Sequence, residues 1–193
     1  MKRFISLDTE TTGLDIKNDR IIEISCNEII NFRITGKKFH SYIKTDREIN
    51  KEAYKIHKIN KKILINKPIF KKISKKIIKI IKKSKVIIHN VNFDYKILKE
   101  EFKRIGKKIK FKTIDTLKIA RKKFPGKKNS LTYLCKRFKI KKKKKHSALQ
   151  DSINLAKVFI LMSSKQRKIN IKKKKIKKKN ISNKKKKNII LFK

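Results

Sequence analysis

The sequence predicts an α/β domain with a mixed β-sheet, followed by a basic tail. Two observations predict it. Short segments rich in apolar and β-branched residues come first, with turn signals between them, as in strands joined by short links. Segments with apolar residues three and four positions apart come later and alternate with further short strands. This order is typical of a sheet that holds both parallel and antiparallel neighbours, with helices packed on it.

The expected elements follow from local patterns along the chain. Pro68 can open a helix, Gly106 can close one, and Asp115 can cap one. In chain order we expect strands at 3–8, 20–30 and 37–44 as an antiparallel meander, a helix over 68–83, a strand at 86–89, a helix over 93–106, a short strand and then a helix within 113–124, a turn and a helix within 125–140, and a final amphipathic helix over 146–162.

Length and charge set the domain organisation. The chain has 193 residues, with 61 Lys and Arg against 14 Asp and Glu, which gives a formal charge of +47. This length suits one domain, expected over 1–163, plus a tail. Residues 164–193 hold fifteen Lys or Arg and no acid, without a durable apolar period, so we expect them to be disordered when free.

The positive charge has two explanations. It can reflect a polyanionic partner, because lysines that neutralise phosphates release counterions and bind tightly. It can also reflect base composition, since the abundant Lys, Ile and Asn all have codons rich in A and T. Both remain open, and in either case the field around the protein attracts nucleic acid.

Several protein classes are excluded by composition. No apolar run approaches the ~20 residues that a membrane helix needs. The N-terminal segment is positive, but only four residues separate Arg3 from Asp8, so we do not expect a signal peptide. Cys26 and Cys135 are far apart and belong to no CxxC pair. We therefore expect a reduced, cytoplasmic protein without disulfides, and not a secreted scaffold, a membrane protein or a zinc ribbon.

The acids that remain in this lysine-rich chain form three patterned groups. Asp8 and Glu10 share one face of a strand, where they repel each other unless a hard cation such as Mg²⁺ or Mn²⁺ lies between them. Asp94 begins a helix after an apolar strand, and His146 precedes Asp151 by five residues at the last helix. Each group alone has a simpler explanation: exposed acids, a carboxylate near a helix N-terminus, or a solvated histidine.

Taken together, the three groups resemble the motifs of the DEDDh family of 3′–5′ exonucleases, which have an RNase H-like fold. The first motif, DxE, is Asp8-Thr9-Glu10. The second is Asp94 after the HNxxFD stretch, and the third is His146 with Asp151. The resemblance implies a five-stranded mixed sheet flanked by helices and a metal-dependent hydrolase that releases nucleoside 5′-monophosphates from a 3′ end.

The resemblance also implies roles for individual residues. Two Mg²⁺ or Mn²⁺ ions are expected per site, with Asp8 as the bridging ligand, Glu10 and Asp151 on the first ion and Asp94 on the second. His146 is expected to be the general base. Expected substrate contacts, besides the metal ligands Asp8, Glu10 and Asp151, are Thr9, Thr11, Thr12, Glu52, Ile56, His57 and Asn90.

Within that family the chain resembles the proofreading epsilon subunits of bacterial DNA polymerase III. The segments that carry this likeness are 39–47, 120–131 and 134–140. Expected partners are then a DNA 3′ end, the polymerase alpha subunit through 188–193, and the sliding clamp through Gln166 to Ile171. The sequence departs from the pattern at Lys58, where glycine is frequent, and at Ile169 and Ile171, which replace the usual anchors of the clamp segment.

Two other functions remain open from the sequence. One is an RNA-trimming exonuclease of the same fold, because the motifs do not distinguish DNA from RNA. The other is a non-catalytic, basic nucleic-acid-binding protein, although all five catalytic positions are present.

Overall fold

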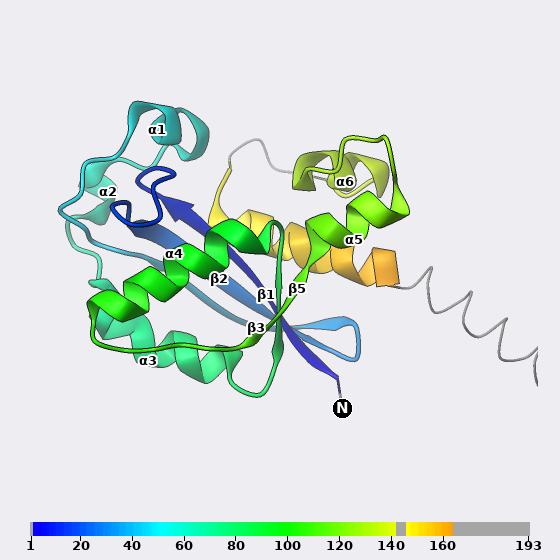
Figure 1. Cartoon of the computed structure of the whole chain (residues 1–193), viewed down its shortest axis with the longest axis horizontal. Coiled ribbons are helices and arrows are strands. Elements are labelled where there is room, and N and C mark those ends of the chain that lie inside the picture. Colours follow the sequence, from blue (N-terminus) through cyan, green and yellow to red (C-terminus); the bar gives the residue numbers. More distant parts are fainter. Residues whose placement is uncertain (1, 142–145, 164–193) are drawn as a thin grey trace, which may run out of the picture. The chain divides into compact units, whose positions relative to one another are not determined.

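A five-stranded mixed β-sheet organises the computed structural model, which describes residues 2–141 and 146–163 (Figure 1). The strands are β1 (Arg3–Thr11), β2 (Ile21–Ile30), β3 (Arg33–Tyr42), β4 (Lys85–Ile88) and β5 (Lys112–Asp115). Their order in the sheet is β3-β2-β1-β4-β5. β2 is antiparallel to β1 and to β3, whereas β4 is parallel to β1 and to β5. The predicted fold class is therefore confirmed.

The described helices are α1 (Lys51–His57), α2 (Lys61–Leu64), α3 (Phe70–Ile81), α4 (Val91–Arg104), α5 (Thr116–Lys123), α6 (Leu131–Arg137) and a last helix over 148–163. One compact unit is Met1–Phe159, and the other, Ile160–Lys193, has only residues 160–163 described. The predicted boundary at 163 stays a prediction. No helix in the described ranges is long and apolar enough to cross a bilayer.

Helices cover both faces of the sheet because the strand residues alternate. Ile5 and Leu7 belong to a buried apolar cluster with α3 and α4. The neighbouring residues point to the opposite face, where Phe4 contacts Phe159 of the last helix with ring centroids 5.1 Å apart. Asp8 and Glu10 continue the Phe4 series, so their side chains face the last helix. This alternation places the first acidic pair on the side of the sheet that also carries Asp151.

The structure corrects several expected boundaries. β3 begins at Arg33, four residues before the expected start, and α3 begins at Phe70, two residues after Pro68. α4 begins at Val91, because Asn90 has a left-handed backbone (φ 76°) and breaks the chain direction there. Asp115 caps α5 as predicted, accepting from the backbone N–H groups of Leu117 and Lys118 at 2.9 and 3.1 Å.

Two short helices were not predicted at all. α1 has seven residues and α2 has four, which is too short for an apolar period to appear. Both begin with an asparagine cap. Asn50 Oδ1 accepts from Glu52 N–H at 2.8 Å, and Asn60 Oδ1 accepts from Ile63 N–H at 3.1 Å. The backbone N–H of Asn50 also donates to Thr12 O at 2.8 Å, so α1 begins beside the end of β1.

Candidate active site

Three carboxylates converge at the end of β1. Asp8 and Glu10 come from β1 and Asp151 from the last helix, and each offers an oxygen that lies within 4.8 Å of the other two. Asp151 is buried, whereas Asp8 and Glu10 keep part of their surface. Oxygen ligands at this spacing are the donors that Mg²⁺ and Mn²⁺ prefer. The chemistry of the three side chains thus fits a hard divalent cation.

Buried hydrogen bonds fix Asp151 in this place. The backbone N–H of Ala148, at the start of the last helix, donates to Glu23 Oε2 of β2 at 3.1 Å. Ser152 Oγ donates to Ser25 Oγ and accepts from Asn27 Nδ2, both at 2.8 Å. These contacts tie the first turns of the helix to β2, the strand beside β1. Asp151 precedes Ser152, and its side chain is therefore held against the face that carries Asp8 and Glu10.

Asp94 reaches the end of β1 from the other face of the sheet. It lies in the first turn of α4, is buried, and its Oδ1 accepts from Thr9 Oγ1 at 2.7 Å. Since Thr9 lies between Asp8 and Glu10 on β1, this bond brings the fourth acid of the motif set next to the other three. Burial raises the pKa of Asp94 to about 6, against a partial lowering by the bond from Thr9.

Burial and the negative charge of the cluster both act on Asp8. Its pKa is raised well above the ordinary value, first by burial and then by the nearby carboxylates of Asp94, Glu10 and Asp151. When a cation neutralises the neighbouring carboxylates, the ionised form of such a carboxyl group becomes less unfavourable. The raised pKa of Asp8 and the spacing of the carboxylate oxygens therefore both favour a bound cation.

His146 approaches the same cluster from the start of the last helix. Its Nδ1 lies 3.2 Å from Asp151 Oδ2, and 44% of its side chain is exposed. A carboxylate only accepts hydrogen bonds, so Nδ1 carries the hydrogen in the pair and Nε2 of the neutral ring keeps its lone pair. The exposed ring can therefore accept a proton at Nε2.

The three predicted threonine contacts have their hydroxyls engaged within the protein. Thr9 donates to Asp94, as described above, and Thr11 Oγ1 donates to Gly13 O at 2.6 Å. Thr12 Oγ1 donates to Asp19 Oδ1 at 2.7 Å, and Thr12 has no exposed surface. The expected substrate contact of Thr12 stays a prediction.

The other expected contacts lie on α1 and before α4. Glu52 is exposed, and its Oε1 accepts from Lys55 Nζ at 2.7 Å. Ile56 is 57% exposed, as an apolar side chain that could contact a base would be. His57 is buried instead, and its Nδ1 accepts from the N–H of Ile59 at 3.0 Å. Asn90 is exposed at the start of α4.

Glu23 is a residue of this site that the sequence reasoning missed. It lies opposite Glu10 in the β1–β2 register, is buried, and pairs with His40 Nε2 at 2.7 Å while its other oxygen accepts from Ala148. It thus holds the helix that carries Asp151. The only sequence signal was an acid in the second strand of an acid-poor chain, because no local motif connects it with Ala148.

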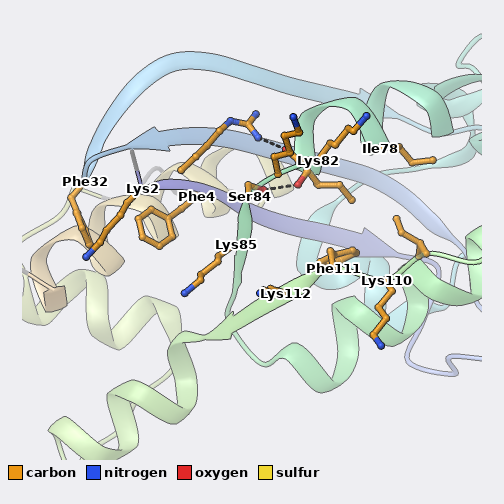
Figure 2. Close-up of a pocket in the computed structure, with 14 residues that line it drawn as sticks. Lys2, Phe4, Phe32, Ile78, Lys82, Ser84, Lys85, Lys110, Phe111 and Lys112 are labelled. Carbon is orange, nitrogen blue, oxygen red and sulfur yellow. Dashed lines mark hydrogen bonds between the residues drawn. The ribbon is translucent and has the colours of Figure 1, made fainter.

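The larger of two described cavities lies away from the acids. Figure 2 shows this cavity of about 840 Å³, lined by the first residues of β1, the end of α3 and the start of β5, with Lys82, Lys85 and Lys112 around Phe4 and Phe111. None of Asp8, Glu10, Asp94, His146 and Asp151 lines it. The volume of a cavity therefore does not identify the candidate active site of this chain.

A divalent cation is expected to stabilise the protein more at pH 7.5 than at pH 5. The raised pKa of Asp94, about 6 in the folded protein, means that the fold binds this proton more tightly than the unfolded chain does. The associated stability is complete below about pH 4 and is lost as the pH rises through 6. Asp8 contributes in the same direction. Cations replace the lost protons at higher pH and compete with them at lower pH.

Thermal unfolding with and without MnCl₂ at both pH values measures this difference. At a concentration 100 times the dissociation constant, a bound ion adds about 2.7 kcal/mol, or roughly 5–10 °C in the melting temperature. NaCl at matched ionic strength is the control. A shift at pH 7.5 that is no larger than the shift at pH 5 would contradict the linkage.

Comparison with known proteins places this geometry among nucleases. Residues 5–159 match the family model described as Exonuclease. The chain is 47% identical over 180 residues to the DNA polymerase III subunit epsilon of Buchnera aphidicola subsp. Schizaphis graminum, covering 87% of this chain and 77% of the relative. It is 44% identical over 169 residues to the subunit of that name from Rickettsia prowazekii, covering 83% and 74%.

Solved structures give the same grouping. Exonuclease X, in a complex with 5′ overhanging duplex DNA, aligns with a TM-score of 0.70 at 26% identity and covers 84% of this chain and 92% of its own. Exonuclease I of E. coli, in a complex with a dT13 oligonucleotide, aligns with a TM-score of 0.79 at 18% identity and covers 88% and 42%. The second likeness concerns the fold alone.

Proposed function

The chain belongs to the exonuclease family that contains the epsilon subunits of DNA polymerase III and is a proofreading 3′–5′ exonuclease of the DEDDh type, and we propose the following roles for its residues. Asp8, Glu10 and Asp151 hold a divalent cation, Asp94 assists a second one, and His146 is the general base. The observation that carries the proposal is the convergence of three carboxylate oxygens within 4.8 Å, beside a histidine paired with one of them.

The proposed ions are two Mg²⁺ or Mn²⁺. When bound, such ions supply charge neutralisation at phosphorus and lower the pKa of the attacking water. The chain's own residues do the remaining work. Asp8 and Glu10 orient the ligand oxygens from one face of β1, and the bond from Thr9 keeps Asp94 in reach from the other face. His146 takes the proton from the attacking water at Nε2, while Asp151 holds the ring through Nδ1.

The proposed substrate is the 3′-terminal phosphodiester of DNA, and the product is a nucleoside 5′-monophosphate. The relatives' names and the DNA-bound Exonuclease X support DNA as the polymer. The exposed Ile56 of α1 lies on a helix that begins beside the end of β1, where it can contact the terminal base. Glu52 and His57 of the same helix are proposed to support that contact.

The proposed partner is the rest of a DNA polymerase III, which the relatives' names support. Within it we propose contact with the alpha subunit through 188–193 and with the sliding clamp through Gln166 to Ile171. Both segments lie outside the described residues, and their binding stays a prediction. The clamp segment can be tested with a peptide of residues 164–173. We expect this peptide to bind the sliding clamp, and absence of binding would reject the assignment.

The test of the proposed function is digestion of 3′-labelled oligonucleotides by the purified full-length chain. We expect trimming of single-stranded and mispaired DNA ends with Mg²⁺ or Mn²⁺, slower trimming of a paired end, and none in EDTA. An RNA strand of the same sequence is the matched substrate control, and faster digestion of RNA would assign an RNA-trimming enzyme. Tight binding without cleavage would reject the nuclease function and favour a nucleic-acid-binding protein.

A further inference from the structure

A second cavity lies between the end of β4, helix α5 and the loop that precedes α6. Its volume is about 620 Å³. His89 and Asn90 line it from the end of β4, Arg121 from α5, and Lys127 and Asn129 from the loop. The expected substrate contacts included Asn90 alone of these residues. The cavity is therefore mostly unassigned by the chemistry described above.

We propose that this cavity binds a backbone phosphate of the substrate strand, upstream of the bond that is cut, through Arg121 and Lys127. The proposal rests on the proposed nuclease function, in which the 3′ end of the DNA strand lies at Asp8. It deepens that function by assigning a subsite that grips the strand without reading its sequence. Three features carry it: the position of the cavity, the charge of its lining and the rigidity of its loop.

The sheet register places the cavity next to the acidic cluster. In the parallel β1–β4 pair, Ser6 is opposite Ile87, and β4 ends at Ile88, so His89 follows β4 at the same edge of the sheet at which β1 carries Asp8. Neighbouring strands lie about 4.8 Å apart. β5 follows on the far side of β4 and leads directly into α5, which carries Arg121 (Figure 1). A DNA strand whose 3′ end lies at Asp8, and which runs from there toward β4 and β5, therefore passes this cavity close to its 3′ end.

The charge of the lining selects an anion. Arg121 and Lys127 are exposed, and within the described ranges neither forms an ion pair with a carboxylate. No Asp or Glu is among the residues that line the cavity. The one aromatic ring among the residues that line it is that of His89, whose Nδ1 lies 2.9 Å from Thr116 Oγ1. The lining therefore offers no phenyl or indole ring on which a base could stack. These contacts suit a phosphodiester and not a base.

The loop that presents Lys127 is held by its own hydrogen bonds. Asn129 Nδ2 donates to Lys127 O at 2.7 Å and to Phe124 O at 3.1 Å, and Asn129 is buried. Gly126 has a φ of 68°, which lets the chain reverse between those two carbonyls. The guanidinium of Arg137 lies 4.3 Å from the centre of the Phe124 ring and supports the other end of the loop. Binding here needs little loop ordering.

The experiment compares the full-length wild type with Arg121→Ala and with Lys122→Ala. Lys122 is the next residue of α5, is exposed and does not line the cavity, so it controls for the loss of one positive charge. Affinity for a fluorescent single-stranded dT oligonucleotide is measured by anisotropy in EDTA at several salt concentrations. Hydrolysis of the p-nitrophenyl ester of thymidine 5′-monophosphate, which has no upstream phosphate, is measured with Mn²⁺.

We expect Arg121→Ala to weaken oligonucleotide binding about 3- to 10-fold and to reduce the slope of log affinity against log salt by about 0.7 relative to Lys122→Ala. Hydrolysis of the small ester should not change. Equal salt slopes for the two variants would overturn the proposal, and so would a parallel loss of ester hydrolysis. Absence of ester hydrolysis in the wild type would instead reject the proposed nuclease function, and the binding measurement would still decide this subsite.

Discussion

Asp8→Asn is expected to abolish metal-dependent trimming of a DNA 3′ end while making the metal-free protein more stable. The rate should fall by more than the roughly 10²–10⁴-fold that removal of a general base costs, because every proposed ion position loses a ligand. The gain in stability follows from the raised pKa of Asp8, whose charged form is disfavoured by burial and by Asp94, Glu10 and Asp151. An amide of the same shape carries no charge for those neighbours to repel.

The gain in stability of Asp8→Asn is expected to depend on pH. A carboxyl group whose pKa is raised on folding costs stability only where it is ionised. The advantage of Asp8→Asn should therefore be small near pH 4 and should grow as the pH rises toward neutrality, because the raised pKa of Asp8 makes its ionisation in the folded protein unfavourable. Urea unfolding in EDTA at several pH values measures the free energy of unfolding, and digestion of a labelled oligonucleotide measures the rate.

Asp46→Asn is the matched control, because Asp46 is an exposed acid outside the cluster. Its replacement removes one negative charge from the same +47 chain and should leave both the activity and the pH dependence of stability near those of the wild type. Retained activity in Asp8→Asn would contradict the site assignment. Lower stability of Asp8→Asn at pH 7 without metal would contradict the electrostatic account while leaving the catalytic role open.

The parts of this fold that the sequence predicts are those in which local pattern and long-range packing agree. The alternation in β1 places Asp8 and Glu10 on one face, and it also places Ile5 and Leu7 in the core on the other. Asp115 was predictable as a cap because the bond it forms reaches only two and three residues along the chain. Such features need no knowledge of the tertiary structure.

The parts that could not be predicted depend on residues that are distant in sequence. Glu23 supports the helix of Asp151 through a hydrogen bond across 125 residues. The resemblance implies that Thr12 lies near the substrate, but it does not predict that the Thr12 hydroxyl donates to Asp19 Oδ1 or that Thr12 has no exposed surface. The loop between these two residues depends on Gly13, since a Cβ atom there would lie 2.4 Å from Asp19 Oδ2. A motif gives the residues of a site but not how the neighbouring residues are packed.

His146→Ala is expected to lower the rate of 3′-end hydrolysis by roughly 10²–10⁴-fold without preventing cation binding. The three clustered carboxylates remain in this variant, so Mn²⁺ should still raise its melting temperature as it does in the wild type. The pairing with Asp151 Oδ2 makes Nε2 the proton acceptor, and the side chain is 44% exposed. Removing the ring therefore leaves an open space beside the position of the attacking water.

That open space separates a chemical role of His146 from a structural one. Imidazole added to the buffer can enter it and accept the proton, so it should restore part of the activity of His146→Ala and none of the activity of Asp8→Asn. If His146 only positioned Asp151, its loss would weaken the Mn²⁺-induced rise in melting temperature, and imidazole would restore nothing. The two outcomes differ in both measurements, because a proton acceptor can be supplied from solution whereas a displaced carboxylate cannot be returned to its place.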